Sequence, residues 1–175
     1  MNLKEHIRSI PDYPKKGILF RDITTLIKNE HAFIECINQI VKRSKNFKFN
    51  KISAIESRGF IFASAVSYIL KKPFVLLRKK NKLPAETHSI DFELEYGTAT
   101  MEVHKDSIDK DDTVLIIDDL IATGGTAEAA ASLIEISKGK VAGFIFVINL
   151  YDLGGSDNLI RNKYKVENLI EFPGH

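Results

Sequence analysis

The stretch VLIIDDLIATGGT, from Val114 to Thr126, decides the fold of this chain. Its first residues are apolar and rich in β-branched side chains, which favours a strand over 113–117. Because a continuous apolar strand is buried on both faces, this run predicts an α/β protein with a mostly parallel sheet between layers of helices. The glycines that follow are predicted to open a helix over about 125–137.

The neighbouring segments alternate in the same way. Apolar residues at spacings of three and four predict a helix over 30–44. Apolar runs predict strands over 51–55, 73–77 and 141–150, with a helix over 59–70 between the first two strands. Such alternation builds a parallel sheet.

Two segments have a different character. Between Arg78 and Asp112 the charge rises, and polar residues alternate with apolar ones in 89–95 and 98–104. This alternation predicts an antiparallel hairpin that lies outside the main sheet and is half exposed to solvent. Residues 2–9 are predicted to form a short amphipathic helix.

Composition places limits on the class of protein. With 175 residues, 44% hydrophobic and 27% charged, the chain is expected to form a single domain over 1–175. The net charge of +2 is too small for most nucleic-acid-binding proteins. No apolar stretch approaches the roughly 20 residues that cross a bilayer, so we expect no membrane partner and a cytoplasmic location. Cys36 lies in an apolar helical pattern and is predicted to be a core residue, not a nucleophile.

The glycine-rich loop carries the clearest chemical signal. Ligands of parallel α/β sheets bind at the carboxyl ends of the strands, where this loop is predicted to lie. Its glycines let backbone amides approach an anion, and the helix N-terminus adds about half a positive charge. The loop therefore suits a phosphate, while Asp118 and Asp119 suit vicinal sugar hydroxyls or Mg²⁺. Such short motifs also occur without a ligand, so DD or TGGT alone leaves both interpretations open.

Longer patterns narrow the choice. The sequence contains neither GxxxxGK[ST] nor GxGxxG. The whole stretch 114–126 instead resembles the phosphoribosyl-pyrophosphate (PRPP) signature of the type I phosphoribosyltransferases. Within that family, GILFRDI (17–23), ESRGF (56–60) with RKKNKLP (78–84), and LEYG (94–97) are similar to the adenine phosphoribosyltransferases.

The resemblance implies the type I phosphoribosyltransferase fold, with an antiparallel hood hairpin at about 79–104 and an N-terminal base-binding segment. It implies transfer of the phosphoribosyl group from PRPP to N9 of adenine, which gives AMP and pyrophosphate in purine salvage. It also implies Mg²⁺, bound mainly through PRPP near Asp118 and Asp119 with no metal site made by direct protein ligands. A homodimer is implied as well, with the region after Arg58 and around Arg78 near the interface.

The same resemblance implies a role for each residue of this sequence that matches a functional position of the family. Asp118 and Asp119 would bond the ribose hydroxyls and stabilise positive charge developing at C1′. Glu95 would act as the catalytic acid on the hood, bonded to purine N7, with Tyr96 covering the ligand. The remaining positions divide by the ligand group that they would hold: Ala122, Thr123, Gly124, Gly125 and Thr126 for the 5′-phosphate, Ser57, Arg58, Arg78 and Lys82 for pyrophosphate, and Leu19, Phe20, Arg21 and Leu150 for adenine. A non-proline cis peptide is implied between Glu56 and Ser57.

Without the family, several of these residues have plain structural interpretations. Glu95 fits an exposed carboxylate on a hairpin, and Phe20 and Leu150 fit a core. Lys71, Lys72 and Lys80 fit a solvated face.

Two other functions compete with this one. A PRPP-sensing transcriptional regulator would need a DNA-binding domain, and only about 11 residues precede the matching segment. A transferase for xanthine or a pyrimidine would keep the phosphate loop and change the base pocket. Asn81, where the family usually has glycine, and Asn149, where an acid is common, depart from the family pattern.

Overall fold

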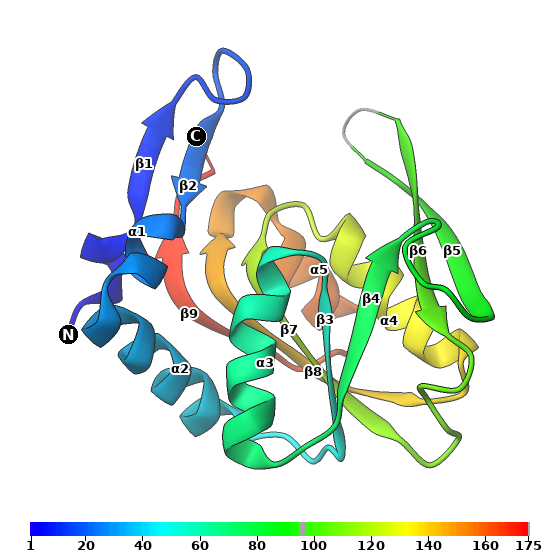
Figure 1. Ribbon diagram of the computed structural model, residues 1–175. Coiled ribbons are helices and arrows are strands. Elements are labelled where there is room, and N and C mark those ends of the chain that lie inside the picture. Colours follow the sequence, from blue (N-terminus) through cyan, green and yellow to red (C-terminus); the bar gives the residue numbers. More distant parts are fainter. Residues whose placement is uncertain (95–96, 175) are drawn as a thin grey trace.

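A seven-stranded sheet forms the middle of the molecule, in the strand order β5-β6-β4-β3-β7-β8-β9 (Figure 1). The structure is a computed structural model that describes residues 1–94 and 97–174. The parallel part of the sheet consists of β4 (Phe74–Lys79), β3 (Lys51–Ile55), β7 (Thr113–Ile121), β8 (Lys140–Leu150) and β9 (Val166–Phe172). The predicted α/β class and its mostly parallel sheet are confirmed.

Strand β7 is longer than predicted. It ends at Ile121 instead of Ile117, because its pairing with β8 continues through Asp118↔Phe146 to Ile121↔Asn149. Asp118 and Asp119 therefore lie within the strand, and the ladder fixes the backbone of both acids.

Helices cover both faces of the sheet and enclose two hydrophobic cores. Helices α2 (Glu30–Ser44) and α3 (Arg58–Leu70) pack on one face, against Leu115 and Ile117 among others. Helix α4 (Gly125–Ile136) packs on the other face, against Val114 and Ile116, next to Leu159 of α5 (Gly155–Arg161). The four β7 side chains are fully buried, which confirms that this strand is covered on both sides.

Cys36 belongs to the α2 core, as predicted. It is fully buried, and burial raises the pKa of its thiol to about 12. No helix in the described part of the chain is long and apolar enough to cross a bilayer.

The predicted hairpin consists of β5 (Thr87–Glu93) and β6 (Thr98–His104), but it does not lie outside the main sheet. Strand β4 continues past its predicted end, and its residues Arg78 and Lys79 pair antiparallel with Glu102 and Met101. This short stretch of pairing joins the hairpin to the edge of the sheet (Figure 1).

The N-terminal segment forms a separate two-stranded ribbon. A single 3₁₀ turn, η1 (Leu3–His6), precedes β1 (Arg8–Pro11), which pairs antiparallel with β2 (Leu19–Asp22). The predicted helix over 2–9 is wrong for its second half, because pairing with β2 stabilises an extended backbone there. A short helix, α1 (Thr24–Lys28), connects the ribbon to α2.

Candidate active site

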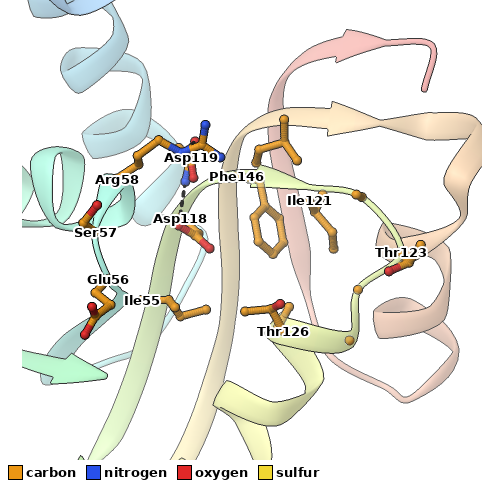
Figure 2. A pocket seen from close by; sticks show the side chains of 15 residues that line it. Ile55, Glu56, Ser57, Arg58, Asp118, Asp119, Ile121, Thr123, Thr126 and Phe146 are labelled. Atoms are coloured by element: carbon orange, nitrogen blue, oxygen red, sulfur yellow. Dashed lines mark hydrogen bonds and ion pairs between the residues drawn. The ribbon is translucent and has the colours of Figure 1, made fainter. Parts of the chain in front are cut away.

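A cavity of about 400 Å³ opens at the carboxyl ends of β3 and β7 (Figure 2). Its walls are formed by residues 55–58, 118–127 and Phe146. Figure 2 shows Arg58 and Asp119 together at one end of this cavity and the loop that bears Thr123 at the other. The ESRGF turn and the glycine-rich loop, far apart in sequence, thus share one site.

The loop from Ala122 to Gly124 leads from β7 into α4. Gly124 has φ +95°, in the left-handed region that favours glycine. It also precedes the first turn of α4, and no side chain of the described residues caps that turn. The first amide N–H groups of the helix are therefore available to an anion in the cavity.

Gly155, the first residue of α5, supports this loop from behind. Its N–H donates a hydrogen bond to Ala122 O at 3.0 Å. A Cβ at this position would lie 2.4 Å from Ala122 O and 2.7 Å from Gly124 N, so the close approach requires glycine. The sequence analysis missed this residue, although the pair Gly154-Gly155 soon after a strand was a usable signal.

The two acids of β7 are held in place from two directions. Asp118 Oδ1 accepts a hydrogen bond from Asp119 N at 2.9 Å. On the other side, a Cβ on Gly59 of α3 would lie 2.5 Å from the same oxygen. The pKa of Asp118 is raised well above its ordinary value. Loss of hydration is the largest cause, and the negative charge of Asp119 is the second. Burial also raises the pKa of Asp119, against the opposing effect of Arg58.

Arg58 connects the cavity to the N-terminal ribbon. Its Nε lies 2.9 Å from Asp119 Oδ2 and forms an ion pair with it. The angles of this contact do not meet those of a hydrogen bond, so Oδ2 has no hydrogen-bond partner among the described residues. The Arg58 guanidinium carbon also lies 5.6 Å from the centroid of the Phe20 ring on β2. The Arg58 guanidinium therefore contacts both Asp119 and Phe20 of the ribbon.

Arg78 and Lys82 lie beside the cavity and are linked to its wall through Glu56. Arg78 Nε donates to Glu56 Oε2 at 2.9 Å, and Arg78 Nη1 donates to Lys82 O at 3.3 Å. The Glu56–Ser57 peptide bond is cis, as the resemblance implied. The cationic residues expected for one ligand group thus gather on one side of the cavity.

The residues expected to bind the base come from two elements. Leu19 and Phe20 on β2 are half-buried, Arg21 next to them is buried, and Leu150 is buried at the end of β8. The two terminal nitrogens of the Arg21 side chain bond to Ser9 and to Pro173, while its buried Nε has no hydrogen-bond partner among the described residues.

Comparison with known proteins decides the family. The model of the phosphoribosyl transferase domain matches residues 22–172. The chain is 79% identical over 175 residues to an adenine phosphoribosyltransferase of Pelagibacter ubique, with both chains covered in full. This chain belongs to the adenine phosphoribosyltransferase family. It is accordingly an enzyme that transfers a pentosyl group.

Solved structures of this family have the same fold. The adenine phosphoribosyltransferase of Thermoanaerobacter pseudethanolicus is 46% identical and superposes with a TM-score of 0.93, over 97% of this chain and 98% of that one. The Giardia lamblia enzyme, solved in complex with 9-deazaadenine, is 31% identical with a TM-score of 0.92, over 98% and 96% of the two chains.

The two strands of the hood, β5 and β6, are described in the structure. Glu95 and Tyr96, the residues expected to act between them, lie outside the described residues.

Asn81 is the first departure from the family pattern, where glycine is usual. It has φ +65°, and its N–H donates to Glu102 Oε2 at 3.0 Å. Asparagine tolerates this left-handed conformation better than most residues, so the substitution keeps the turn.

The second departure lies close to the expected base site. Asn149 is buried, and its Nδ2 donates to Glu171 Oε2 at 2.8 Å. The asparagine therefore bonds to the acid of the neighbouring strand β9.

Several apolar residues of the cavity wall were not predicted as site residues: Ile55, Leu120, Ile121, Ala127 and Phe146. Of these, Ile55 and Phe146 had been counted only within predicted strands. Nothing in their own sequence neighbourhoods distinguishes them from core residues.

Proposed function

We propose that this chain transfers the 5-phosphoribosyl group of PRPP to N9 of adenine and thereby forms AMP and pyrophosphate, in purine salvage. The observation that carries the proposal is one cavity in which the anion-binding loop, residues 122–126, shares a wall with Asp118, Asp119 and Arg58. A ligand that carries a sugar and a phosphate together fits these groups. The 9-deazaadenine bound to the Giardia lamblia enzyme supports adenine as the base.

The 5′-phosphate is assigned to the loop and the first turn of α4. Amides of Ala122 to Gly125 and the hydroxyls of Thr123 and Thr126 supply donors, and the dipole of α4 favours the negative charge. Gly155 keeps the loop in the shape that directs these donors to one point.

The ribose hydroxyls are assigned to Asp118 and Asp119. Asp119 Oδ2, which lacks a hydrogen bond to any described residue, is a ready acceptor for a hydroxyl. When the bond from C1′ to pyrophosphate breaks, positive charge develops at C1′, and ionised carboxylates beside the ribose stabilise it. The pKa values of both acids are raised by burial, and a positive charge at C1′ would lower them again, which supports this assignment.

Pyrophosphate is assigned to Ser57, Arg58, Arg78 and Lys82. Arg58 is the member of this group that already touches the cavity, and its side chain is 41% exposed, so it is free to turn from Asp119 toward an anion. Arg78 is held by Glu56 at the cavity rim. Bidentate guanidinium contacts suit phosphate oxygens, so these arginines stabilise the leaving group.

Adenine is assigned to the space between Leu19, Phe20 and Arg21 of β2 and Leu150 of β8. Backbone groups near Leu19 and Arg21 would bond the polar edge of the base, while Phe20 and Leu150 cover its faces. Unpaired polar groups penalise a wrong base, which gives preference for adenine over hypoxanthine and guanine. Glu95 is proposed to bond N7 and exchange a proton with the base, which favours attack by N9, with Tyr96 covering the ligand.

Mg²⁺ is proposed as the cofactor. Among the described residues no group of three or more His, Cys, Asp or Glu side chains is placed to hold a metal ion. The ion would be bound mainly through PRPP oxygens, near the carboxylates of Asp118 and Asp119. When bound, the ion neutralises charge on the departing pyrophosphate.

A homodimer is proposed from the apolar surface of α3 and β4. Tyr68 is 86% exposed, and Ile61, Ile69 and Leu76 are also exposed. Exposed apolar side chains of this kind mark protein interfaces. We expect light scattering to give a dimer that Tyr68→Glu dissociates and that Tyr151→Glu, at an exposed tyrosine elsewhere, leaves intact. A monomeric wild type would contradict the assignment.

A cytoplasmic location is proposed as well. Cys36 is a free, buried thiol, which agrees with a reducing compartment.

The reaction is tested by incubating the protein with Mg²⁺, PRPP and one base at a time, then separating the nucleotides. AMP is expected from adenine, at a rate about 100-fold above that of any other base. Comparable rates with adenine, hypoxanthine and guanine would contradict the base assignment. A product from xanthine or a pyrimidine alone would identify a different transferase. PRPP binding with no product from any base would indicate a sensor.

A further inference from the structure

The segment Phe172–Gly174, which begins at the last residue of β9, bonds to both elements of the proposed base site. Toward β2, Arg21 Nη2 donates to Pro173 O at 3.0 Å, and the guanidinium carbon lies 4.3 Å from the Phe172 ring centroid. Toward β8, Gly174 N donates to Asp152 Oδ1 at 2.6 Å, in the turn η2 (Tyr151–Leu153) that follows Leu150. Figure 1 shows this end of the chain beside β2.

The bonds of Arg21 fix how β2 faces the cavity. Arg21 is 6% exposed, and another of its nitrogens donates to the Ser9 hydroxyl on β1. Because successive side chains of a strand point to opposite faces, Arg21 on the Phe172 side leaves Phe20 on the side of Arg58. The buried guanidinium thus sets the orientation of the residue proposed to cover the base.

The contact with η2 is equally close. A Cβ on Gly174 would lie 2.6 Å from Leu153 Cγ and 2.7 Å from Asp152 Oδ1. The segment therefore packs directly on the turn that begins after Leu150, with no space for a side chain between them.

We propose that Phe172–Gly174 is a strut that sets the spacing between the two walls of the adenine site, Leu19–Phe20 on β2 and Leu150 on β8. Arg21 and Asp152 are then positioning residues that act on adenine binding through the strut. The inference rests on the base site assigned above. The strut's hydrogen bonds to the two walls go to Arg21 and Asp152. A flat purine held between two walls is sensitive to their separation, so KM for adenine should respond more strongly than KM for PRPP.

Three variants and a control test the strut. Arg21→Met and Asp152→Ala each remove one bond, and each is expected to raise KM for adenine about tenfold, with KM for PRPP changed less than twofold. Asp152→Asn keeps the acceptor oxygen and should restore a near wild-type KM. Lys4→Met is the matched control, because Lys4 Nζ lies 4.7 Å from the same Phe172 ring but is not part of either bond.

The outcomes distinguish a failure of the strut proposal from a failure of the base-site assignment. Phe20→Ala and Leu150→Ala should raise KM for adenine if the base site is correctly placed. If they do and the strut variants do not, the strut is wrong and the base site stands. If none of the four raises it, the base site itself is misplaced and the strut falls with it. Equal rises in both KM values, or no rescue by Asp152→Asn, would also overturn the proposal. Because Asp152 is exposed, its variants give an answer even if Arg21→Met fails to fold.

Discussion

The Arg58 guanidinium and the Asp119 carboxylate form an ion pair at one end of the cavity, with Nε and Oδ2 separated by 2.9 Å. The acid is almost fully buried, whereas the Arg58 side chain is 41% exposed. The carboxylate is thus fixed, and the guanidinium is able to leave it. Arg58 neutralises in the free enzyme the acid proposed to hold the ribose, and pyrophosphate would compete for the same cation.

Loss of Arg58 should shift the pH dependence of the enzyme. Burial raises the pKa of Asp119, and Arg58 is the largest of the effects that lower it, so Arg58→Gln removes the main opposition and leaves only hydrogen bonds against burial. The acidic limb of kcat/KM for PRPP should therefore move to higher pH, and KM for PRPP should rise about tenfold. Steady-state rates from pH 5 to 9 measure both. Arg161→Gln, at an exposed arginine of α5, should change neither; an unmoved acidic limb in Arg58→Gln would contradict the coupling.

Asp118→Asn should stabilise the protein while it inactivates it. The pKa of Asp118 is raised on folding, so from about pH 4 up to the raised value the folded state binds more protons than the unfolded state. Stability then falls as pH rises through that window. The variant, which lacks this half-buried charge, should unfold about 2–4 °C higher than wild type at pH 7 and equally at pH 3. Calorimetry at both pH values, with the exposed Asp106→Asn as control, gives the comparison. A lower unfolding temperature at pH 7 would show that the Asp118 charge does not destabilise the fold.

Gly59→Ala should displace the Asp118 carboxylate without unfolding α3. The new Cβ would fall 2.5 Å from Asp118 Oδ1, an atom at the end of a side chain that is able to turn away, and 3.2 Å from Ile117 O. We expect kcat/KM for PRPP to fall about 100-fold, because a displaced carboxylate no longer meets the ribose. Ser64→Ala, at an exposed position of the same helix, is the control. Full activity in a folded Gly59→Ala variant would show that the position of Asp118 is not critical.

Variants of the phosphate loop and of the hood should change different steady-state constants, KM for PRPP and kcat respectively. Thr126→Ala removes a hydroxyl from the loop and should raise KM for PRPP about tenfold with little change in kcat. Glu95→Gln removes the proposed acid and should lower kcat about 100-fold with little change in KM for PRPP. The reverse pattern would mean that the two roles are exchanged.

Much of the fold follows from local pattern. The unbroken apolar run of β7 predicted burial on both faces, and the alternation of segments from 30 to 77 predicted the parallel sheet. The ribbon β1–β2, helix α5 and strand β9 were not predicted. Each is short or of mixed polarity, and each is stabilised by a partner distant in sequence, such as Ser9 with Arg21 or Leu150 with Phe172. Local propensity contains no information about such partners.

The residues of the site also divide into those that local sequence predicts and those that it does not. The glycines and threonines of residues 122–126 and the acids before them lie in one continuous stretch, so their chemistry could be interpreted from the sequence. Gly155 and Gly59 could not be placed in that way. Their role is to let one backbone approach another, and the atom that each approaches belongs to a different element.

The sequence by itself determined the α/β class and the phosphate-binding chemistry of the loop, because both depend on residues adjacent along the chain. Tertiary structure alone decided that Arg58 meets both Asp119 and Phe20, and that Phe172–Gly174 bonds to β2 and to the turn after β8. Those contacts arise from the order in which strands assemble and the depth to which helices pack, and these are properties of the whole folded chain.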